Sequence, residues 1–493
     1  MNRWNKERGR FFVYIREQLE SEVIDWKILD FDASTLAKMI AAKEITSREA
    51  TETFIDHIKN INPKINFLVG ERFQKALDDA DEADRQLAEN KASGKLFGVP
   101  ISMKESFDVA GMETTGGLLN RKGFVQHTNA DVVQKLKDEG AIILGKTNTP
   151  ELCFCQETDN KLYGRTNNAR DLTRTAGGSS GGEAVMISVG GAAAGLGSDI
   201  GGSIRFPSHF NGVIGFKAGK GQVSAIGSYP PENHALQERM LGIGPITKSV
   251  KDARLLYNIV AKTPAQANII DDFTISVLPK TDYPLSAITT SLIDSVYKFV
   301  EKEFTSERSI PPYFKNSALV WQEIMSIDGA KGPGIEAFGN KPVRPVRAYI
   351  NELVNGKAKV HRYLSWALIG ASLFKPSDKR VQEIEAYVST GDDLLNDYLN
   401  KRILIFPVYH KAAPKHGIVY KEIFSIRKTY QKYMPYVAYA NVWGLPVLTI
   451  PIGTDEEGMP IGVQLISKNG NEEALFTLGE FIEKKFQCYV RVE

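Results

Sequence analysis

The chain has 493 residues, 42% of them hydrophobic and 24% charged, which is the composition of an ordinary globular protein. Its 61 basic and 59 acidic residues give a net charge of +2 without long blocks of either sign, and this excludes a typical nucleic-acid-binding surface. Three cysteines, Cys153, Cys155 and Cys488, make no disulfide framework and favour a reducing, cytoplasmic compartment. The C-x-C pair lacks further ligands at metal spacing, so we expect a buried structural role for it, with no metal or cofactor.

Residues 1–30 mix charged and aromatic residues and predict a short helical lead-in, without the apolar core of a signal peptide. The chain contains no apolar run of about 18 residues, so we expect no transmembrane segment. Residues 31–493 are expected to form a single domain, with a peripheral helical insert at about 262–400, where charge and helical patterning increase.

Helices and strands alternate along most of the chain. Before the insert, the apolar periodicity predicts two helices that break near residues 44–46, with an N-cap at Thr46 or Ser47 and a stop at Pro63. Further helices are expected at 71–90, 130–139 and 250–260, and strands at 66–70, 99–103, 141–145, 212–216, 402–409, 441–453 and 459–466. Residues 150–174 and 410–417 are expected to be loops. The alternation predicts an α/β sandwich.

The stretch 177–205 contains two glycine and serine clusters, GGSSGG and GGS, with a run of small residues between them. They are either flexible loops joined by a helix of small residues or places where a backbone approaches a substrate closely. The G-x-S-x-G around Ser180 is typical of an α/β-hydrolase, but no buried strand precedes it and no histidine stands out as a base. A phosphate-binding loop and a dinucleotide fingerprint are also missing.

Lys104 follows the apolar segment 99–103. A lysine there is either a chain end that reaches solvent or a placed amine, and this segment alone does not decide between them. Burial lowers the pKa of a lysine, and a neutral lysine activates a serine directly or through a second hydroxyl.

Three segments resemble the amidase signature family of Ser-Ser-Lys hydrolases: GVPISMKESFDVAGMETTGG, GGSSGGEAVM and GSDIGGSIRFPSHFNGVIGFK. The resemblance extends from about Asp32 to the C-terminal GLPVLTIPIG and GMPIGVQLI. Lys104-Glu105 and GGSSGGE make the chain most similar to the fatty-acid amide hydrolases within this family. It departs from them at Lys217-Ala218, where Lys-Pro is usual, and we expect no N-terminal membrane helix of the kind that the membrane-anchored members have. The family fold implied is an α/β/α sandwich around a mixed β-sheet.

The resemblance also implies roles for individual residues. Ser203 would be the acylated nucleophile, Ser179 the bridging serine after a cis Gly178-Ser179 bond, and Lys104 the base. The oxyanion hole would consist of the backbone N–H groups of Ile200, Gly201, Gly202 and Ser203. Ser180, Asp199 and Arg205 would support the site by orienting the loop, or would only stabilise it.

The reaction implied is hydrolysis of a carboxylic amide, a small-molecule substrate, to an acid and an amine or ammonia, and fatty-acyl amides are among the expected substrates. The alternative is the glutamine-hydrolysing component of a tRNA-dependent amidotransferase. Tyr363 to Phe374 is an uncharged segment that predicts a core helix, a wall of a hydrophobic substrate channel, or a contact with a membrane surface. A homodimer is a further expectation.

Overall fold

The computed structural model describes residues 27–339, 341–424, 427–486 and 489–492. Most of the predicted N-terminal lead-in, residues 1–26, lies outside this range. The helix break near residues 44–46 is confirmed: Thr46 caps the helix that follows through a reciprocal capping box with Glu49. Pro63, the expected stop, lies within that helix, which continues to Ile65.

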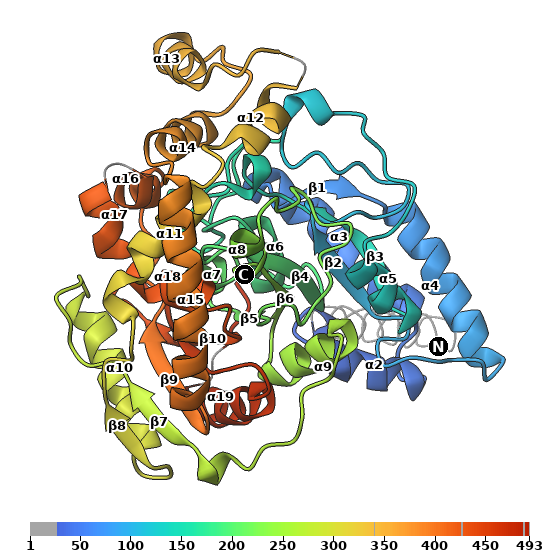
Figure 1. Cartoon of the computed structure of the whole chain (residues 1–493). Helices are drawn as coiled ribbons and strands as arrows, with labels where there is room; N and C mark the ends of the chain where they lie inside the picture. The colour runs from blue at the N-terminus through green and yellow to red at the C-terminus, as the bar shows by residue number, and fades with distance from the viewer. Residues whose placement is uncertain (1–26, 340, 425–426, 487–488, 493) are drawn as a thin grey trace, which may run out of the picture.

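The described residues form a mixed sheet with strand order β1-β3-β2-β4-β6-β5-β10-β11-β9-β7-β8. Strand β2 runs parallel to β3 and β4, β7 runs parallel to β8 and β9, and the other pairs are antiparallel. The mixed α/β architecture is therefore confirmed (Figure 1). The strands are β1 (Leu68–Glu71), β2 (Pro100–Lys104), β3 (Ile142–Thr147), β4 (Ala194–Asp199), β5 (Ile214–Lys217), β6 (Gly242–Thr247), β7 (Thr274–Val277), β8 (Ser306–Arg308), β9 (Arg402–Pro407), β10 (Val447–Thr454) and β11 (Pro460–Ile466).

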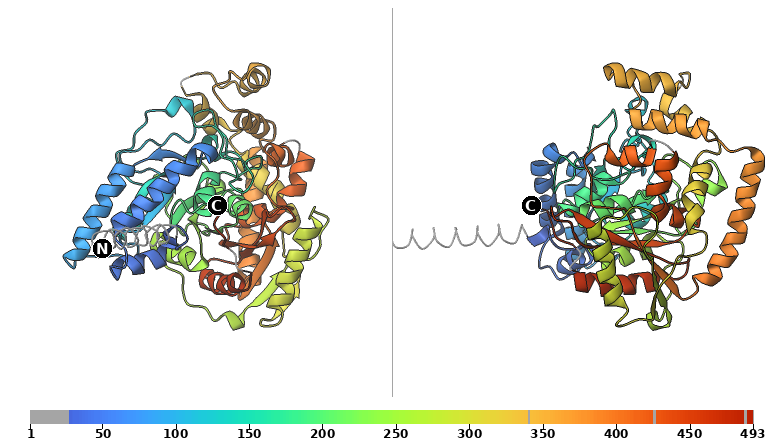
Figure 2. Two further views of the ribbon diagram at one scale, coloured as in Figure 1. Left: turned by 180° about the vertical axis from the view of Figure 1, so that it is seen from behind. Right: turned by 90° about the vertical axis from the view of Figure 1, so that its left-hand side faces the viewer.

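Helices flank this sheet, and α15 runs along the outside of the molecule (Figure 2). The helices before the predicted insert are α2 (Ala33–Ala41), α3 (Ser47–Ile65), α4 (Phe73–Ala88), α5 (Asp131–Asp138), α6 (Gly181–Ser188), α7 (Arg205–Asn211), α8 (Ala235–Glu238) and α9 (Val250–Val260). The helices within the predicted insert and after it are α10 (Ala287–Val300), α11 (Ser317–Met325), α12 (Lys331–Phe338), α13 (Pro345–Asn355), α14 (Arg362–Leu373), α15 (Asp378–Tyr398), α16 (Ile418–Phe424), α17 (Arg427–Tyr433), α18 (Pro435–Val442) and α19 (Glu472–Phe486).

Alternating side chains of the central strands supply cores on both faces of the sheet. On β10, Leu448 and Ile450 pack in the core formed with α9, α10 and α19. Val447, one position earlier, packs in the opposite core, which contains side chains of α7, α11, α15 and α18. The two cores together bury the central strands on both sides, as in a sandwich.

The predicted insert at about 262–400 is not purely helical. It contains helices α10 to α15, and strands β7 and β8 also lie within it and extend the central sheet beyond β9. The sequence pattern does not reveal these two strands because they are only four and three residues long, and β8 is half exposed. The division of the chain into a lead-in and a single domain stays a prediction.

Two other predictions shift at their boundaries. The strand predicted at 441–453 starts only at Val447, because its first residues end helix α18. The small residues between the two glycine and serine clusters form helix α6 and then strand β4, rather than a helix alone. Neither cluster is therefore a flexible linker.

Candidate active site

Lys104 is the last residue of β2, and its side chain is fully buried. Its amine Nζ lies 2.7 Å from Ser179 Oγ and 3.0 Å from Ser198 Oγ. Burial lowers the pKa of Lys104 below the usual lysine value, and the nearby Cys153, Asp199 and Glu183 only partly oppose this effect. The sequence left two roles open for this lysine, and the structure places it as a buried amine against a serine.

Ser179 lies just before α6, after a cis Gly178-Ser179 peptide bond, as the resemblance implied. The backbone is tightly packed there. A side chain at Gly178 would approach the backbone O of Cys155 to 2.6 Å and the backbone N of Glu157 to 2.7 Å. The glycine at this position is therefore required by the close approach of another segment.

Ser203 belongs to the second cluster and precedes α7; its side chain is nearly buried and lines a cavity. The N–H of Ser180 donates to the Ser203 carbonyl over 3.0 Å, so the two clusters are joined directly. Among the described residues, no hydrogen bond joins the Ser203 and Ser179 hydroxyls. The structure thus brings Lys104, Ser179 and Ser203 to one place, with the Lys104–Ser179 contact already made.

The backbone at the expected oxyanion hole is held from outside by two side chains. Trp321 Nε1 donates to the Ile200 carbonyl over 2.7 Å, and Gln156 Nε2 donates to the Gly201 carbonyl over 2.9 Å. A trans peptide directs its C=O and N–H oppositely, so these contacts also orient the N–H groups that follow. A side chain at Gly201 would approach the Trp321 ring to 2.6 Å, which explains the glycine there.

One expected oxyanion donor is already occupied. The Gly202 N–H donates to Asp199 Oδ1 over 2.9 Å, so it is not free in this structure. The N–H groups of Ile200, Gly201 and Ser203 donate to no other group among the described residues. Three of the four expected donors are therefore free to bind an oxyanion, and Gly202 instead stabilises the turn, with a φ of +92°.

Asp199 and Arg205 form a fully buried bidentate ion pair, with both contacts at 3.0 Å. Burial alone would raise the pKa of Asp199, but the charge and hydrogen bonds of Arg205 outweigh it and lower the pKa below its usual value. Asp199 also accepts from the Ile204 N–H, and Arg205 donates to Gln464 and to the Val437 carbonyl. The pair thus ties the Ser203 turn to β11 and α18.

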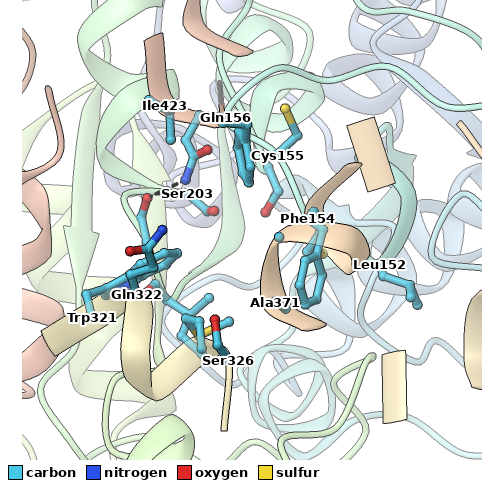
Figure 3. Close-up of a pocket in the computed structure, with 18 of the residues that line it drawn as sticks. Leu152, Phe154, Cys155, Gln156, Ser203, Trp321, Gln322, Ser326, Ala371 and Ile423 are labelled. Atoms are coloured by element: carbon cyan, nitrogen blue, oxygen red, sulfur yellow. Dashed lines mark hydrogen bonds between the residues drawn. The ribbon is translucent and has the colours of Figure 1, made fainter. Parts of the chain in front are cut away.

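Ser203 opens into a cavity of about 360 Å³. Figure 3 shows Ser203 beside Gln156 and Gln322, with Phe154 and Ala371 further along the cavity. Most of its walls are apolar, and they come from η2 (Glu151–Cys153) and the residues after it, from α11, and from the C-terminal half of α14. The uncharged segment Tyr363–Phe374 forms most of α14 and supplies seven wall residues: Trp366, Ala367, Ile369, Gly370, Ala371, Leu373 and Phe374. The substrate-channel interpretation of this segment is the one that this position supports.

Several residues at the site were not predicted from the sequence. Ser198 precedes Asp199 in the third matching motif. This position, on β4, is the signal by which the sequence could have identified it. Gln156 lies in a segment expected to be a polar loop, and Trp321 in the predicted insert, where nothing marks either residue. Cys153, expected to be structurally buried, is partly exposed and lines the cavity.

The described part of the chain contains no group of three or more His, Cys, Asp or Glu side chains that could hold a metal ion. Within the same residues, no helix has both the length and the apolar character needed to cross a membrane. Cys488 lies outside the described residues.

At this site a buried lysine contacts a serine, and comparison with known proteins identifies the family. The Amidase family model matches residues 49–282 and 373–476, so the chain belongs to the amidase family and is an amidohydrolase. It is similar to fatty-acid amide hydrolase 2-A of Danio rerio, with 32% identity over 93% of this chain and 89% of the relative.

Two further similarities cover nearly the whole chain. A glutamyl-tRNA(Gln) amidotransferase component from Trichodesmium erythraeum is 28% identical over 92% of this chain and 98% of the relative. A solved structure of fatty acid amide hydrolase superposes with a TM-score of 0.79 at 21% identity, covering 95% of this chain and 87% of that one. The last similarity shows the fold alone.

Proposed function

We propose that the chain hydrolyses carboxylic amides through an acyl-enzyme on Ser203, with Ser179 and Lys104 as the proton relay. The observation that carries this proposal is the 2.7 Å contact between the buried Lys104 amine and Ser179, beside a nucleophile that opens into a cavity. A lysine with a lowered pKa is neutral in a larger fraction of molecules, so it accepts a proton more readily near neutral pH.

In this mechanism, neutral Lys104 takes the proton of Ser179 as Ser179 takes that of Ser203. The Ser203 oxygen bonds to the amide carbon, and the carbonyl oxygen becomes an oxyanion near the N–H groups of Ile200, Gly201 and Ser203. The protons return through the same relay to the nitrogen as the C–N bond breaks, and the amine leaves. A water molecule then attacks the acyl-enzyme and releases the acid. One oxyanion donor typically contributes about 3 to 4 kcal/mol.

Fatty-acyl amides are the proposed substrate class. The cavity size is in the range of small-molecule sites, and its walls include Phe154, Trp321, Met325, Trp366 and Ile369. Each buried methylene of an acyl chain contributes about 0.8 kcal/mol, or roughly fourfold in binding. An apolar wall of this kind disfavours glutamine, the substrate expected in the tRNA-dependent alternative.

An acyl-length series tests this substrate class. For amides of one amine, from acetyl to long-chain acyl, we expect kcat/KM to rise with chain length by up to about fourfold per methylene until the cavity is filled. The measurement is kcat/KM for each member, with glutamine included. A maximum at acetyl or aryl amides would contradict the fatty-acyl assignment, and efficient ammonia release from glutamine would favour the amidotransferase alternative.

Gly370 offers a matched variant for the same series. It lines the cavity on α14, and a Cβ atom placed there would meet no atom within 4 Å outside its own stretch of the helix. Gly370→Leu therefore narrows the cavity without a backbone clash and favours the helix. It should lower kcat/KM for the longest amides about tenfold and leave acetyl amides unchanged. An equal effect on both would show that long chains bind elsewhere.

Exposed apolar side chains support the predicted contact with a membrane surface. Several exposed apolar side chains lie on α13 and at the end of α14, among them Val346, Ile350, Leu353, Val354 and Leu373. These residues support the proposal of a peripheral membrane contact. The homodimer stays a prediction.

A further inference from the structure

Glu183 is a fully buried carboxyl group that the mechanism above does not use. It lies in the first turn of α6, four residues after Ser179. Its two carboxyl oxygens contact hydroxyl groups on two different strands: Oε1 accepts from Ser102 on β2, and Oε2 accepts from Thr147 on β3 over 2.5 Å. Within the described residues it has no ion-pair partner in direct contact. A carboxyl group this deeply buried needs a compensating interaction.

The geometry of β2 places Glu183 and Lys104 in the same layer. Side chains two residues apart on a strand point to the same face, so Ser102 and Lys104 both face α6. Thr147 is the register partner of Lys104 on β3. Both hydroxyl groups that hold Glu183 therefore belong to residues next to Lys104 in the sheet. Gly195 on β4 gives the carboxylate room, because a side chain there would overlap Glu183 Oε1.

Among the described residues, none of the other groups that face Lys104 is a carboxyl group without a cation in direct contact. Asp199, from β4, is already neutralised by its bidentate pair with Arg205. Cys153, from η2, contributes a sulfur and not a carboxyl group. The serines Ser179 and Ser198 are uncharged donors and acceptors. Glu183 is thus the carboxyl group near Lys104 whose charge no cation in direct contact offsets.

We propose that the Glu183 carboxylate is the charge partner of Lys104, and stabilises the ammonium form that Lys104 takes each time it accepts the proton of Ser179. Glu183 is a positioning residue, because it acts on the reaction through Lys104 and contacts no substrate. This inference rests on the proposed function, since it assigns a role within the same proton relay. It gives the lysine base the partner that a buried cation requires.

Burial opposes the charged form of Glu183, and two hydrogen bonds and the charge of Lys104 favour it. Burial raises the pKa of Glu183 to about 7, even though hydrogen bonds from Ser102 and Thr147 and the charge of Lys104 act in the opposite direction. Both hydroxyl groups are placed to donate, which favours the ionised form. Formation of ammonium at Lys104 favours it further, so the carboxylate is present when its charge is needed.

The test is the pH dependence of Ser203 labelling by a fluorophosphonate, followed by intact mass. A negative Glu183 raises the pKa of Lys104 relative to a neutral neighbour. Glu183→Gln removes this charge with almost no change in shape, so the acid limb of the labelling rate should move to lower pH by about one unit or more. The plateau rate should fall several-fold, because the lysine becomes a weaker base.

Two further variants keep the result interpretable. Glu472→Gln changes another buried carboxyl group, on α19 across the sheet, and should leave the acid limb in place. If Glu183→Gln does not fold, as judged by thermal unfolding, Thr147→Val replaces it. This variant removes one donor to the carboxylate and should move the limb in the same direction by less.

An unchanged acid limb in a folded Glu183→Gln protein would overturn the proposal, even if the labelling rate fell at every pH, because that pattern indicates a structural hydrogen-bonding role only. An unshifted limb in the folded Thr147→Val protein would count against it in the same way where Glu183→Gln is not folded. Failure of the proposed function has a different signature: the wild-type chain would show no labelling at Ser203 at any pH.

Discussion

Ser203→Ala should abolish amide hydrolysis, with kcat lowered about 10⁴-fold or more. The hydroxyl is the only group at this position that forms the acyl bond, and removal of a serine nucleophile leaves only the effects of binding and of the oxyanion hole. Folding should be unaffected, because Ser203 is held through its backbone carbonyl by Ser180 rather than through its side chain. The measurement is kcat for an amide substrate, with thermal unfolding as the check on folding.

Ser208→Ala is the matched control. Ser208 is fully buried on α7, five residues further along, and its hydroxyl has no hydrogen-bond partner among the described residues. The same change of side chain there should leave kcat within a few-fold of wild type. Residual hydrolysis near the wild-type rate in Ser203→Ala would contradict the assignment of the nucleophile.

Lys104→Ala should lower amide hydrolysis by about 10²- to 10⁴-fold and ester hydrolysis by clearly less. An amine leaves only after it receives a proton, and Lys104 starts the relay that delivers it. An alkoxide needs that proton less. The measurement is kcat/KM for an amide and an ester with the same acyl group, compared as a ratio between wild type and variant.

Lys146→Met provides the control for burial of a lysine. Lys146 is nearly fully buried on β3, beside β2, and donates to Thr114 over 2.9 Å and to the Glu113 carbonyl. It contacts neither serine, so its replacement should leave the amide-to-ester ratio unchanged while lowering stability. An equal loss for amide and ester in Lys104→Ala would show that the lysine organises the site without moving the proton.

The sequence singles out the proposed reacting groups because they lie in contiguous motifs with strong local requirements. Gly201 and Gly202 are needed where Trp321 and Phe206 approach the backbone, so the GGS cluster signals a crowded turn even before its neighbours are known. Lys104 is visible as a charge after a buried strand. These signals depend on residues near in sequence, and single-chain patterns capture them.

The surroundings of the site could not be predicted because they come from distant parts of the chain. Trp321 donates to a backbone carbonyl of the turn from more than a hundred residues away in the sequence. Gln156 donates to a second carbonyl of the same turn from about forty-five residues away. The occupied N–H of Gly202 depends on how Asp199 is placed by Arg205. Strands β7 and β8 are short and lie at the edge of the sheet, where pairing rather than pattern defines them.

The central claim is that the reaction passes through an ester on Ser203. Its most direct test is to quench the enzyme with acid during turnover of a slowly hydrolysed acyl substrate and to locate any added mass by peptide mapping. We predict the mass of the acyl group on the peptide containing Ser203, and a larger acylated fraction when deacylation is slowed. Acylation at Ser179 or at Lys104 instead of Ser203 would contradict this claim.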